Sequence, residues 1–334
     1  MAWDAARVRK VTALLVGRLG DLIVSTPFLR GLRERFPRAH IRLVVSAAAQ
    51  EAARLIPFVD EVLPLHPYYR PGPNLRALAA LRTGLQDLLV DLNPSFSKAS
   101  AALAFLARAK VSAAFAKGRL DSLYALRAAP PGLREHVLDR YARLAALIGA
   151  PYEPRLEMRP TKEDERQADI LINGLDAERS ALRVAIHPGN FKKFDNRWPE
   201  EKFAELANLL LDEAGLSLYF LAGPGEGETV RGITARLRRP VPVLGPVPVG
   251  LTAALLKRLD IFVCNITGTT HLAAAVGAPT FGLYAGYTHA VWRPRGEEHG
   301  GVISDSWDSC RGIPVADAFR GLQACMQKRR GGAP

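Results

Sequence analysis

Apolar runs typical of β-strands alternate with stretches of helical periodicity along almost the whole chain, and this rhythm restricts its fold more than any other feature. The alternation predicts βα units and parallel sheets. In the first half we expect strands over 11–16, 41–45, 61–65 and 88–92. Helices are expected near 26–36, 47–55, 75–85, 99–106 and 135–147.

The same rhythm restarts after the turn at Gly149 and a proline- and charge-rich passage that ends near Asp164. Strands are expected over 183–187, 216–221, 241–244, 261–264 and 280–284, with helices after Pro199, Gly227, Gly250 and Gly268. We therefore predict an α/β protein of two Rossmann-like domains, 1–160 and 165–310, facing across a cleft. A terminal helix is expected within 311–330. Open α/β sheets bind ligands beyond the carboxyl ends of their strands.

Composition limits the setting and the partners. Charged residues interrupt the first ten positions, which argues against a signal peptide, and no segment has ~20 uninterrupted apolar residues. Three cysteines without metal-ligand spacing favour a reducing cytoplasm. A net charge of +12 favours anionic partners such as nucleic acid, a membrane surface or a phosphorylated glycolipid. The arginine-rich composition that a GC-rich genome encodes would give the same charge without any such partner.

The first motif, Gly17 to Pro27, directly follows the first predicted strand. Its glycines allow a tight turn, and the next helix offers free N–H groups. Asp21 is unusual there, because a carboxylate would repel phosphate. Its partner would then be a hydroxyl group, as for a general base. The alternative is that Asp21 caps the helix, and spacing alone favours that alternative.

Two further motifs follow predicted strands and suit a diphosphate. Glycine and three cations follow the strand that ends at His187, although a solvated basic loop would look the same; the residues are Gly189, Asn190, Lys192, Lys193 and Arg197. The other motif combines a helix start with hydroxyl groups that together suit an anion; its residues are Thr267, Gly268, Thr269, Thr270 and His271. A lone histidine such as His271 is more often structural.

The fourth motif, Gly223-Pro224-Gly225-Glu226-Gly227-Glu228, follows the strand that ends near Leu221. Its glycines allow a ligand to approach the backbone, and a carboxylate can accept both ribose hydroxyls. For either glutamate taken singly, an ordinary flexible turn is a slightly better explanation.

Together these motifs resemble the heptosyltransferase family, glycosyltransferase family 9. The resemblance runs from about Val11 to Phe319 and rests on the order and spacing of its parts. The matching residues are Gly20-Asp21, Thr26-Pro27, His187-Pro188-Gly189, Arg197-Trp198-Pro199, Thr267-Gly268, His271-Leu272-Ala273-Ala274-Ala275, Gly282-Leu283-Tyr284, Trp292-Arg293-Pro294 and Cys310.

The resemblance implies a GT-B glycosyltransferase that needs neither metal nor cofactor and inverts the sugar configuration. It also implies that the terminal helix within 311–330 returns to pack on the first domain. Asp21 would be the general base, and Gly20 and Lys98 would contact an anionic lipopolysaccharide-type acceptor at the inner face of the membrane. An ADP-heptose-like donor would bind the second domain, with Glu226 on the ribose. The remaining donor contacts would be Gly189, Asn190, Lys192, Lys193, Thr267, Gly268, Thr269 and His271.

Two departures affect the donor side. Ile266 stands where many heptosyltransferases carry aspartate, and Asn196 stands where many carry lysine. The alternatives are therefore a GT-B transferase for another nucleotide sugar and a catalytically silent nucleotide-sugar or glycolipid binding protein. A nicotinamide dehydrogenase is disfavoured, because the first loop lacks Gly-x-Gly-x-x-Gly. Nucleic-acid binding rests on net charge alone, and we do not expect it.

Overall fold

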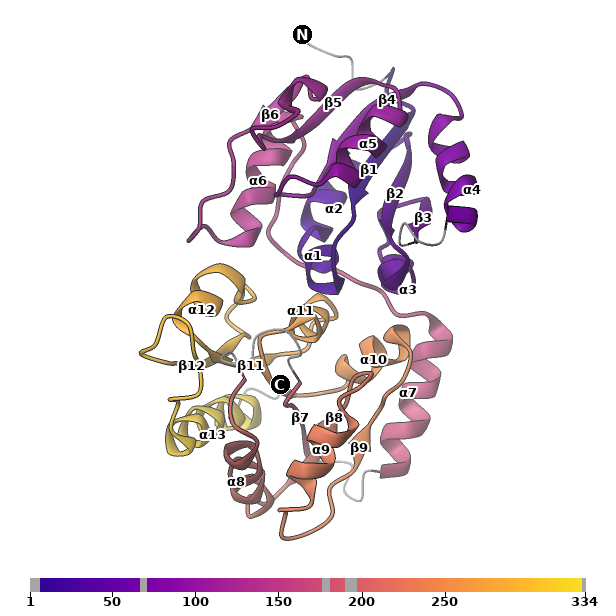
Figure 1. The fold of residues 1–334 in the computed structure, drawn as a ribbon. Coiled ribbons are helices and arrows are strands. Elements are labelled where there is room, and N and C mark those ends of the chain that lie inside the picture. The colour runs from indigo at the N-terminus through magenta and orange to yellow at the C-terminus, as the bar shows by residue number, and fades with distance from the viewer. Residues whose placement is uncertain (1–6, 67–70, 176–180, 190–196, 332–334) are drawn as a thin grey trace. The chain divides into compact units, whose positions relative to one another are not determined.

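The computed structural model describes residues 7–66, 71–175, 181–189 and 197–331. The chain divides into two compact units, Met1–Met158 and Arg159–Pro334. Each unit is built on a six-stranded sheet whose paired strands all run parallel (Figure 1). The alternation in the sequence therefore does correspond to two successive sets of βα units.

The first sheet has the order β3-β2-β1-β4-β5-β6. Its strands are β1 (Lys10–Leu15), β2 (His40–Ser46), β3 (Glu61–Leu65), β4 (Gln86–Asp91), β5 (Ala109–Phe115) and β6 (Leu126–Ala128). The connecting elements are α1 (Leu19–Val24), α2 (Thr26–Arg35), η2 (Ala47–Ala49), α3 (Gln50–Ala53), α4 (Pro71–Arg82), α5 (Lys98–Leu106), η3 (Asp121–Leu123) and α6 (Val137–Leu147). The sequence predicted the first four strands and missed β5 and β6.

Helices cover both faces of this sheet, which explains why nearly every residue of its central strands β1 and β4 is buried. On one face α4 packs beside α5, and their buried side chains join those of the strands in one cluster that includes Leu81, Leu89 and Leu103. A second pair, α2 and α6, also packs together within the unit. Ile41, Leu43, Val44 and Val45 of β2 are all buried, as a strand covered on both faces requires.

The second sheet has the order β12-β11-β10-β7-β8-β9. Its strands are β7 (Leu182–His187), β8 (Leu216–Leu221), β9 (Val243–Leu244), β10 (Ile261–Asn265), β11 (Thr280–Tyr284) and β12 (Gly300–Ile303). Its helices are α7 (Lys162–Leu175), α8 (Glu200–Leu211), α9 (Gly227–Thr234), α10 (Val249–Leu256), α11 (Gly268–Ala275), α12 (Gly286–Trp292) and α13 (Val315–Gly331). Counted within each unit, both strand orders are 3-2-1-4-5-6, the Rossmann order.

The last helix, α13, packs on α8 and β12. Its buried residues Ala318, Leu322 and Met326 belong to the core of the second unit, together with Phe203 and Leu210 of α8. The buried face of α13 therefore belongs to the second unit's core, while its return to the first domain stays a prediction.

The strand order creates one switch point in each unit, where consecutive crossovers leave a sheet in opposite directions. It lies between β1 and β4 in the first sheet and between β7 and β10 in the second. Ligands of open α/β sheets bind at such points. Within the described residues, none of the helices has the length and apolar character to cross a membrane.

A buried polar cluster joins β4, β5 and α5 in the first unit. Asp91 is fully buried, and its Oδ2 accepts hydrogen bonds from Lys117 Nζ at 2.5 Å, from the Tyr124 hydroxyl at 2.6 Å and from Ser100 Oγ. Its Oδ1 accepts from the backbone N–H and the side-chain amide of Asn93, at 3.0 and 2.8 Å. Burial, and then the charge of Asp91, raise the pKa of Tyr124. The cluster fixes the beginning of α5 against the sheet.

Removing the cation from this cluster should destabilise the first unit strongly. Lys117→Met would leave the Asp91 carboxylate buried without its counter-charge, which costs roughly 3–5 kcal/mol of unfolding free energy. Urea denaturation measures the loss. The matched control is Lys110→Met, which breaks an exposed pair with Asp87 and should cost less than about 1 kcal/mol. Equal losses in the two variants would contradict this account.

Candidate functional site

Asp21 lies in the first turn of α1, just beyond the carboxyl end of β1. Its Oδ2 accepts a hydrogen bond from the backbone N–H of Arg18 at 3.0 Å. The carboxylate also lies over Gly17, where an added Cβ would come within 3.0 Å of the Asp21 Cβ. The backbone turn at Gly17 is held in addition by Ser46, whose hydroxyl donates to the Gly17 carbonyl at 2.9 Å. The loop therefore presents Asp21 in one fixed position.

The capping role predicted for Asp21 is therefore real, but it occupies only one of the two carboxylate oxygens. Asp21 is half-buried, and no hydrogen bond to its Oδ1 is found among the described residues. Tyr141 of α6 is fully buried nearby, and burial, followed by the negative charge of Asp21, raises its pKa. A carboxylate with one oxygen held and the other free is arranged as a general base would be.

Gly20 and Lys98 lie on the two sides of the switch point of the first unit. Gly20 is half-buried in α1, and Lys98 is exposed at the first position of α5. The strand ends between them are tied together, because the Asn93 side-chain amide donates to the Leu14 carbonyl at 3.3 Å. The structure thus puts Gly20, Asp21 and Lys98 at neighbouring strand ends, although their sequence separation is large.

In the second unit, His187 ends β7 and Glu226 begins the turn into α9. His187 Nε2 lies 2.8 Å from Glu226 Oε2, and both side chains are buried. The same carboxylate oxygen accepts from the Gly223 N–H at 2.6 Å. Burial alone would raise the pKa of Glu226, but the hydrogen bond and charge of His187, with the Gly223 N–H, lower it below its usual range.

Gly189 is required by this pair. A Cβ built on Gly189 would lie 1.8 Å from Glu226 Oε1, well inside any permitted contact. Glycine is therefore needed here because the Glu226 side chain approaches the backbone closely, which the sequence did not predict. Glu226, predicted to reach a ribose, has Oε2 committed to His187 and Gly223, which leaves Oε1 facing Gly189.

Asn265 is a site residue that the sequence analysis missed. It ends β10 and is fully buried. Its side-chain amide donates to the Pro188 carbonyl at 2.9 Å, and its Oδ1 accepts from the Trp198 N–H at 3.1 Å. These bonds join both ends of the loop after β7 to the neighbouring strand. A buried asparagine directly after an apolar strand was the available signal, since such an amide must find partners.

The Thr267 motif forms the start of α11, as predicted. Thr267 is the N-cap, and its hydroxyl accepts from the Thr269 N–H at 3.2 Å. The Thr270 hydroxyl is turned inward, where it accepts from the Thr267 N–H at 3.1 Å and donates to the Asn265 carbonyl at 2.9 Å. Thr270 therefore serves the cap and not a ligand, while Thr267, Gly268 and Thr269 stay half-buried at the strand edge.

His271 is buried in α11, and its ring centre lies 6.0 Å from that of Trp292. It begins the second turn of the helix, beside the cap formed by Thr267. Four residues named in the sequence analysis, Asn190, Lys192, Lys193 and Asn196, lie outside the described residues.

Comparison with known proteins decides the family. The model of glycosyltransferase family 9 (heptosyltransferase) matches residues 75–314. The chain belongs to this family. It is a glycosyltransferase, as the resemblance in the sequence implied.

The lipopolysaccharide core heptosyltransferase OpsX of Haemophilus influenzae is 24% identical over 285 residues, which cover 83% of this chain and 79% of that protein. Two solved structures share the fold. A family 9 glycosyl transferase from Veillonella parvula has a TM-score of 0.84 at 18% identity, covering 97% of this chain and 99% of its own. The Escherichia coli heptosyltransferase WaaC with ADP has a TM-score of 0.76 at 18% identity, covering 95% and 99%. The predicted GT-B type of α/β fold is confirmed.

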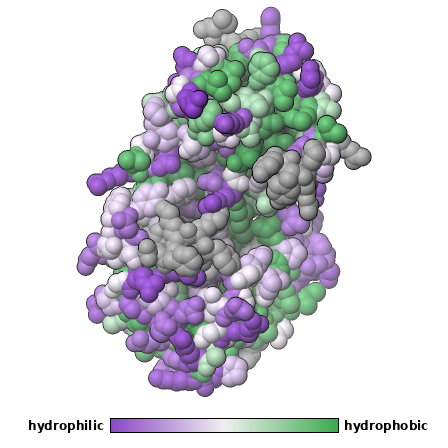
Figure 2. Space-filling model, in the orientation of Figure 1, coloured by the Kyte–Doolittle hydropathy of each residue, from purple (hydrophilic) through white to green (hydrophobic). Residues whose placement is uncertain are grey.

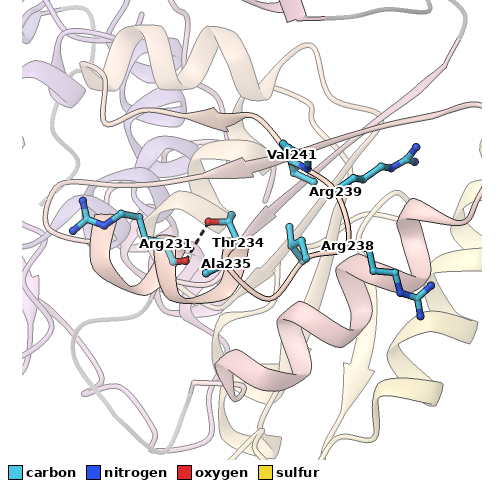
Figure 3. A pocket seen from close by; sticks show the side chains of 8 residues that line it. Arg231, Thr234, Ala235, Arg238, Arg239 and Val241 are labelled. Atoms are coloured by element: carbon cyan, nitrogen blue, oxygen red, sulfur yellow. Dashed lines mark hydrogen bonds between the residues drawn. The ribbon is translucent and has the colours of Figure 1, made fainter.

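A pocket of about 530 Å³ in the second unit of this glycosyltransferase is separate from the carboxyl ends of β7 and β10. It lies at the end of α9, where Figure 3 shows the side chains of Arg231, Arg238 and Arg239 pointing in different directions. Arg238 pairs with Asp212 at 2.9 Å, and Arg239 donates to the Leu211 carbonyl at 2.5 Å. Its cations do not converge on a common point, so it is a poor candidate for the diphosphate.

Substituting Gly189 should disrupt the His187–Glu226 pair. In Gly189→Ala the new methyl group must displace the Glu226 carboxylate, and we expect a loss of about 1–3 kcal/mol in unfolding free energy. The matched control is Gly227→Ala, since nothing lies within 4 Å of a Cβ at that position. Thermal unfolding measures both. An unchanged melting temperature in Gly189→Ala would show that Glu226 is free to move.

The same pair predicts a pH dependence. Because the pKa of Glu226 is lowered from its ordinary value of 4.5, its stabilising effect is present above about pH 4.5 and is lost as the pH falls through the lowered pKa. The difference in melting temperature between the parent and Glu226→Gln should therefore shrink below pH 4.5. The control is Glu228→Gln, at an exposed position in the same turn. A difference that grows in acid would contradict the pairing.

Proposed function

We propose that this glycosyltransferase transfers a heptose from an ADP-heptose-like donor to a lipopolysaccharide-type acceptor, with inversion at the anomeric carbon. The first unit would bind the acceptor and the second the donor. The reaction would take place in the cytoplasm, at the inner face of the membrane. Support for the donor comes from the heptosyltransferase relatives and from the ADP named with one solved relative.

The observation that carries the proposal is the Oδ1 of Asp21, which accepts no hydrogen bond from the described residues and lies at the switch point of the first unit. In the proposed step, Asp21 takes the proton of an acceptor hydroxyl as that oxygen attacks the anomeric carbon. The bond from that carbon to the diphosphate breaks on the opposite face, and the nucleoside diphosphate leaves with the electron pair. Gly20 would allow close approach of the acceptor, and Lys98 would pair with its acidic groups.

The donor diphosphate would lie at the start of α11. Helix N-termini attract anions through their free N–H groups and the helix dipole. Gly268, Thr267, Thr269 and His271 would hold the phosphates, together with the loop that begins at Gly189. Asn190, Lys192 and Lys193 of that loop are proposed contacts on the basis of the family resemblance.

Glu226 is proposed to contact the ribose through Oε1, since Oε2 is taken by His187 and Gly223. A second candidate function is a family 9 transferase that uses another nucleotide sugar. Ile266 favours it, because an apolar, half-buried side chain occupies the position directly before the Thr267 cap.

A panel of nucleotide sugars separates the two functions. Each is added to the protein, and the rise in melting temperature is measured, because a ligand that binds only the folded state stabilises it. ADP-heptose should raise the melting temperature more than UDP- or GDP-sugars, and ADP release with a lipopolysaccharide-type acceptor should follow. Stabilisation and turnover with a non-heptose donor alone would favour the second candidate.

Two substitutions of Asp21 separate its roles. Asp21→Asn keeps an oxygen to accept from Arg18, so stability should be nearly unchanged, whereas turnover should fall by roughly 10²–10⁴ with donor affinity retained. Asp21→Ala removes the cap as well and should also cost about 1 kcal/mol of stability. An active Asp21→Asn variant would exclude the base role.

A further inference from the structure

We propose that the outer face of α4 and α5 docks on an anionic lipid bilayer. The two helices pack side by side on one face of the first sheet. The surface, here called the α4–α5 face, consists of the outward side chains of Leu75, Ala79, Arg82, Lys98, Ala102 and Phe105, all exposed.

Spacing places these residues on one side of each helix. Leu75, Ala79 and Arg82 follow one another at intervals of four and three in α4, and Lys98, Ala102 and Phe105 repeat those intervals in α5. Residues at such intervals lie on one helical face. Each helix thus presents an apolar stripe with a cation at one end.

Exposure of the apolar members is high. Leu75 is 66% exposed and Phe105 72% exposed, and Leu85, just beyond α4, is 50% exposed. Figure 2 shows hydrophobic residues gathered over α4 and α5. Large hydrophobic side chains that cluster on a surface mark a place where a partner removes them from water.

Charge identifies the partner. Between 71 and 106 the chain has only two carboxylates, Asp87 and Asp91. Asp91 is fully buried in its polar cluster, and Asp87 is paired with Lys110 and accepts from two backbone N–H groups. No acidic side chain therefore belongs to the α4–α5 face, whereas Arg82 and Lys98 do. An apolar stripe flanked by cations is the pattern that binds anionic lipid headgroups while inserting side chains into the acyl boundary.

The biological role that we assign to this membrane contact rests on the proposed function. Lys98, which begins the α4–α5 face, also lies on the opposite side of the switch point from Asp21, where the acceptor sugar is proposed to bind. A bilayer against α4 and α5 would hold a lipid-linked acceptor close to that edge of the sheet. Binding to lipid can nevertheless be measured without any substrate.

The test is sedimentation of the full chain with vesicles. We expect binding to vesicles that contain phosphatidylglycerol, weaker binding as salt is added, and little binding to pure phosphatidylcholine. The double variant Leu75→Ser and Phe105→Ser should lower the affinity by about tenfold or more, because both inserted side chains are lost. The matched control is Ile170→Ser on α7, which removes a hydrophobic side chain that is 59% exposed but lies outside the α4–α5 face.

Three results would overturn the proposal: equal binding to both kinds of vesicle, equal binding by the parent and the double variant, or an equal loss in Ile170→Ser. A parent that is a dimer in solution and becomes monomeric in the double variant, without binding vesicles, would identify a protein interface instead. The double variant should retain transfer to a short, water-soluble acceptor. Loss of vesicle binding with that activity intact separates this inference from the proposed function.

Discussion

All strands within each sheet run parallel, and this single constraint determines where chemistry can occur. Every carboxyl end of a sheet lies at the same edge, and crossovers leave that edge in opposite directions at one point only. Asp21 and Lys98 flank that point in the first unit, and Gly189 and Thr267 flank it in the second. Residues far apart in sequence become neighbours there because the hydrogen bonding of the sheet requires it.

The sequence predicted best those elements whose own residues determine their conformation. Strand β10 begins with an uninterrupted apolar run, and β2 contains the apolar run Leu43-Val44-Val45; both strands were predicted nearly to their observed ends. The missed strands lack this signal: β5 is Ala-Lys-Val-Ser-Ala-Ala-Phe, β6 has only three residues, and β12 is Gly-Gly-Val-Ile. All three are strands because they pair with a neighbour already in the sheet, which is information that no local pattern contains.

The candidate site divides in the same way. The positions of its loops followed from glycines and helix caps next to predicted strands, and Asp21 and Thr267 lie where those signals placed them. The sequence did not predict the side-chain contacts that hold the site together. The bond between Glu226 and His187 was not predicted, because nothing in the sequence links two residues that are 39 positions apart. Asn265 was overlooked because its partners, Pro188 and Trp198, belong to another strand's loop.

The intimate contact between Gly189 and Glu226 has a consequence for how this enzyme can diversify. A side chain at position 189 must displace the Glu226 carboxylate, so under the proposed function a change of sugar preference would arise at less cost elsewhere along this edge of the sheet. Ile266 is the natural candidate, because it is half-buried next to the α11 cap and its side chain makes no hydrogen bonds that a replacement would break. If the donor binds at the start of α11 as proposed, a change at Ile266 can alter the donor preference while position 189 remains glycine.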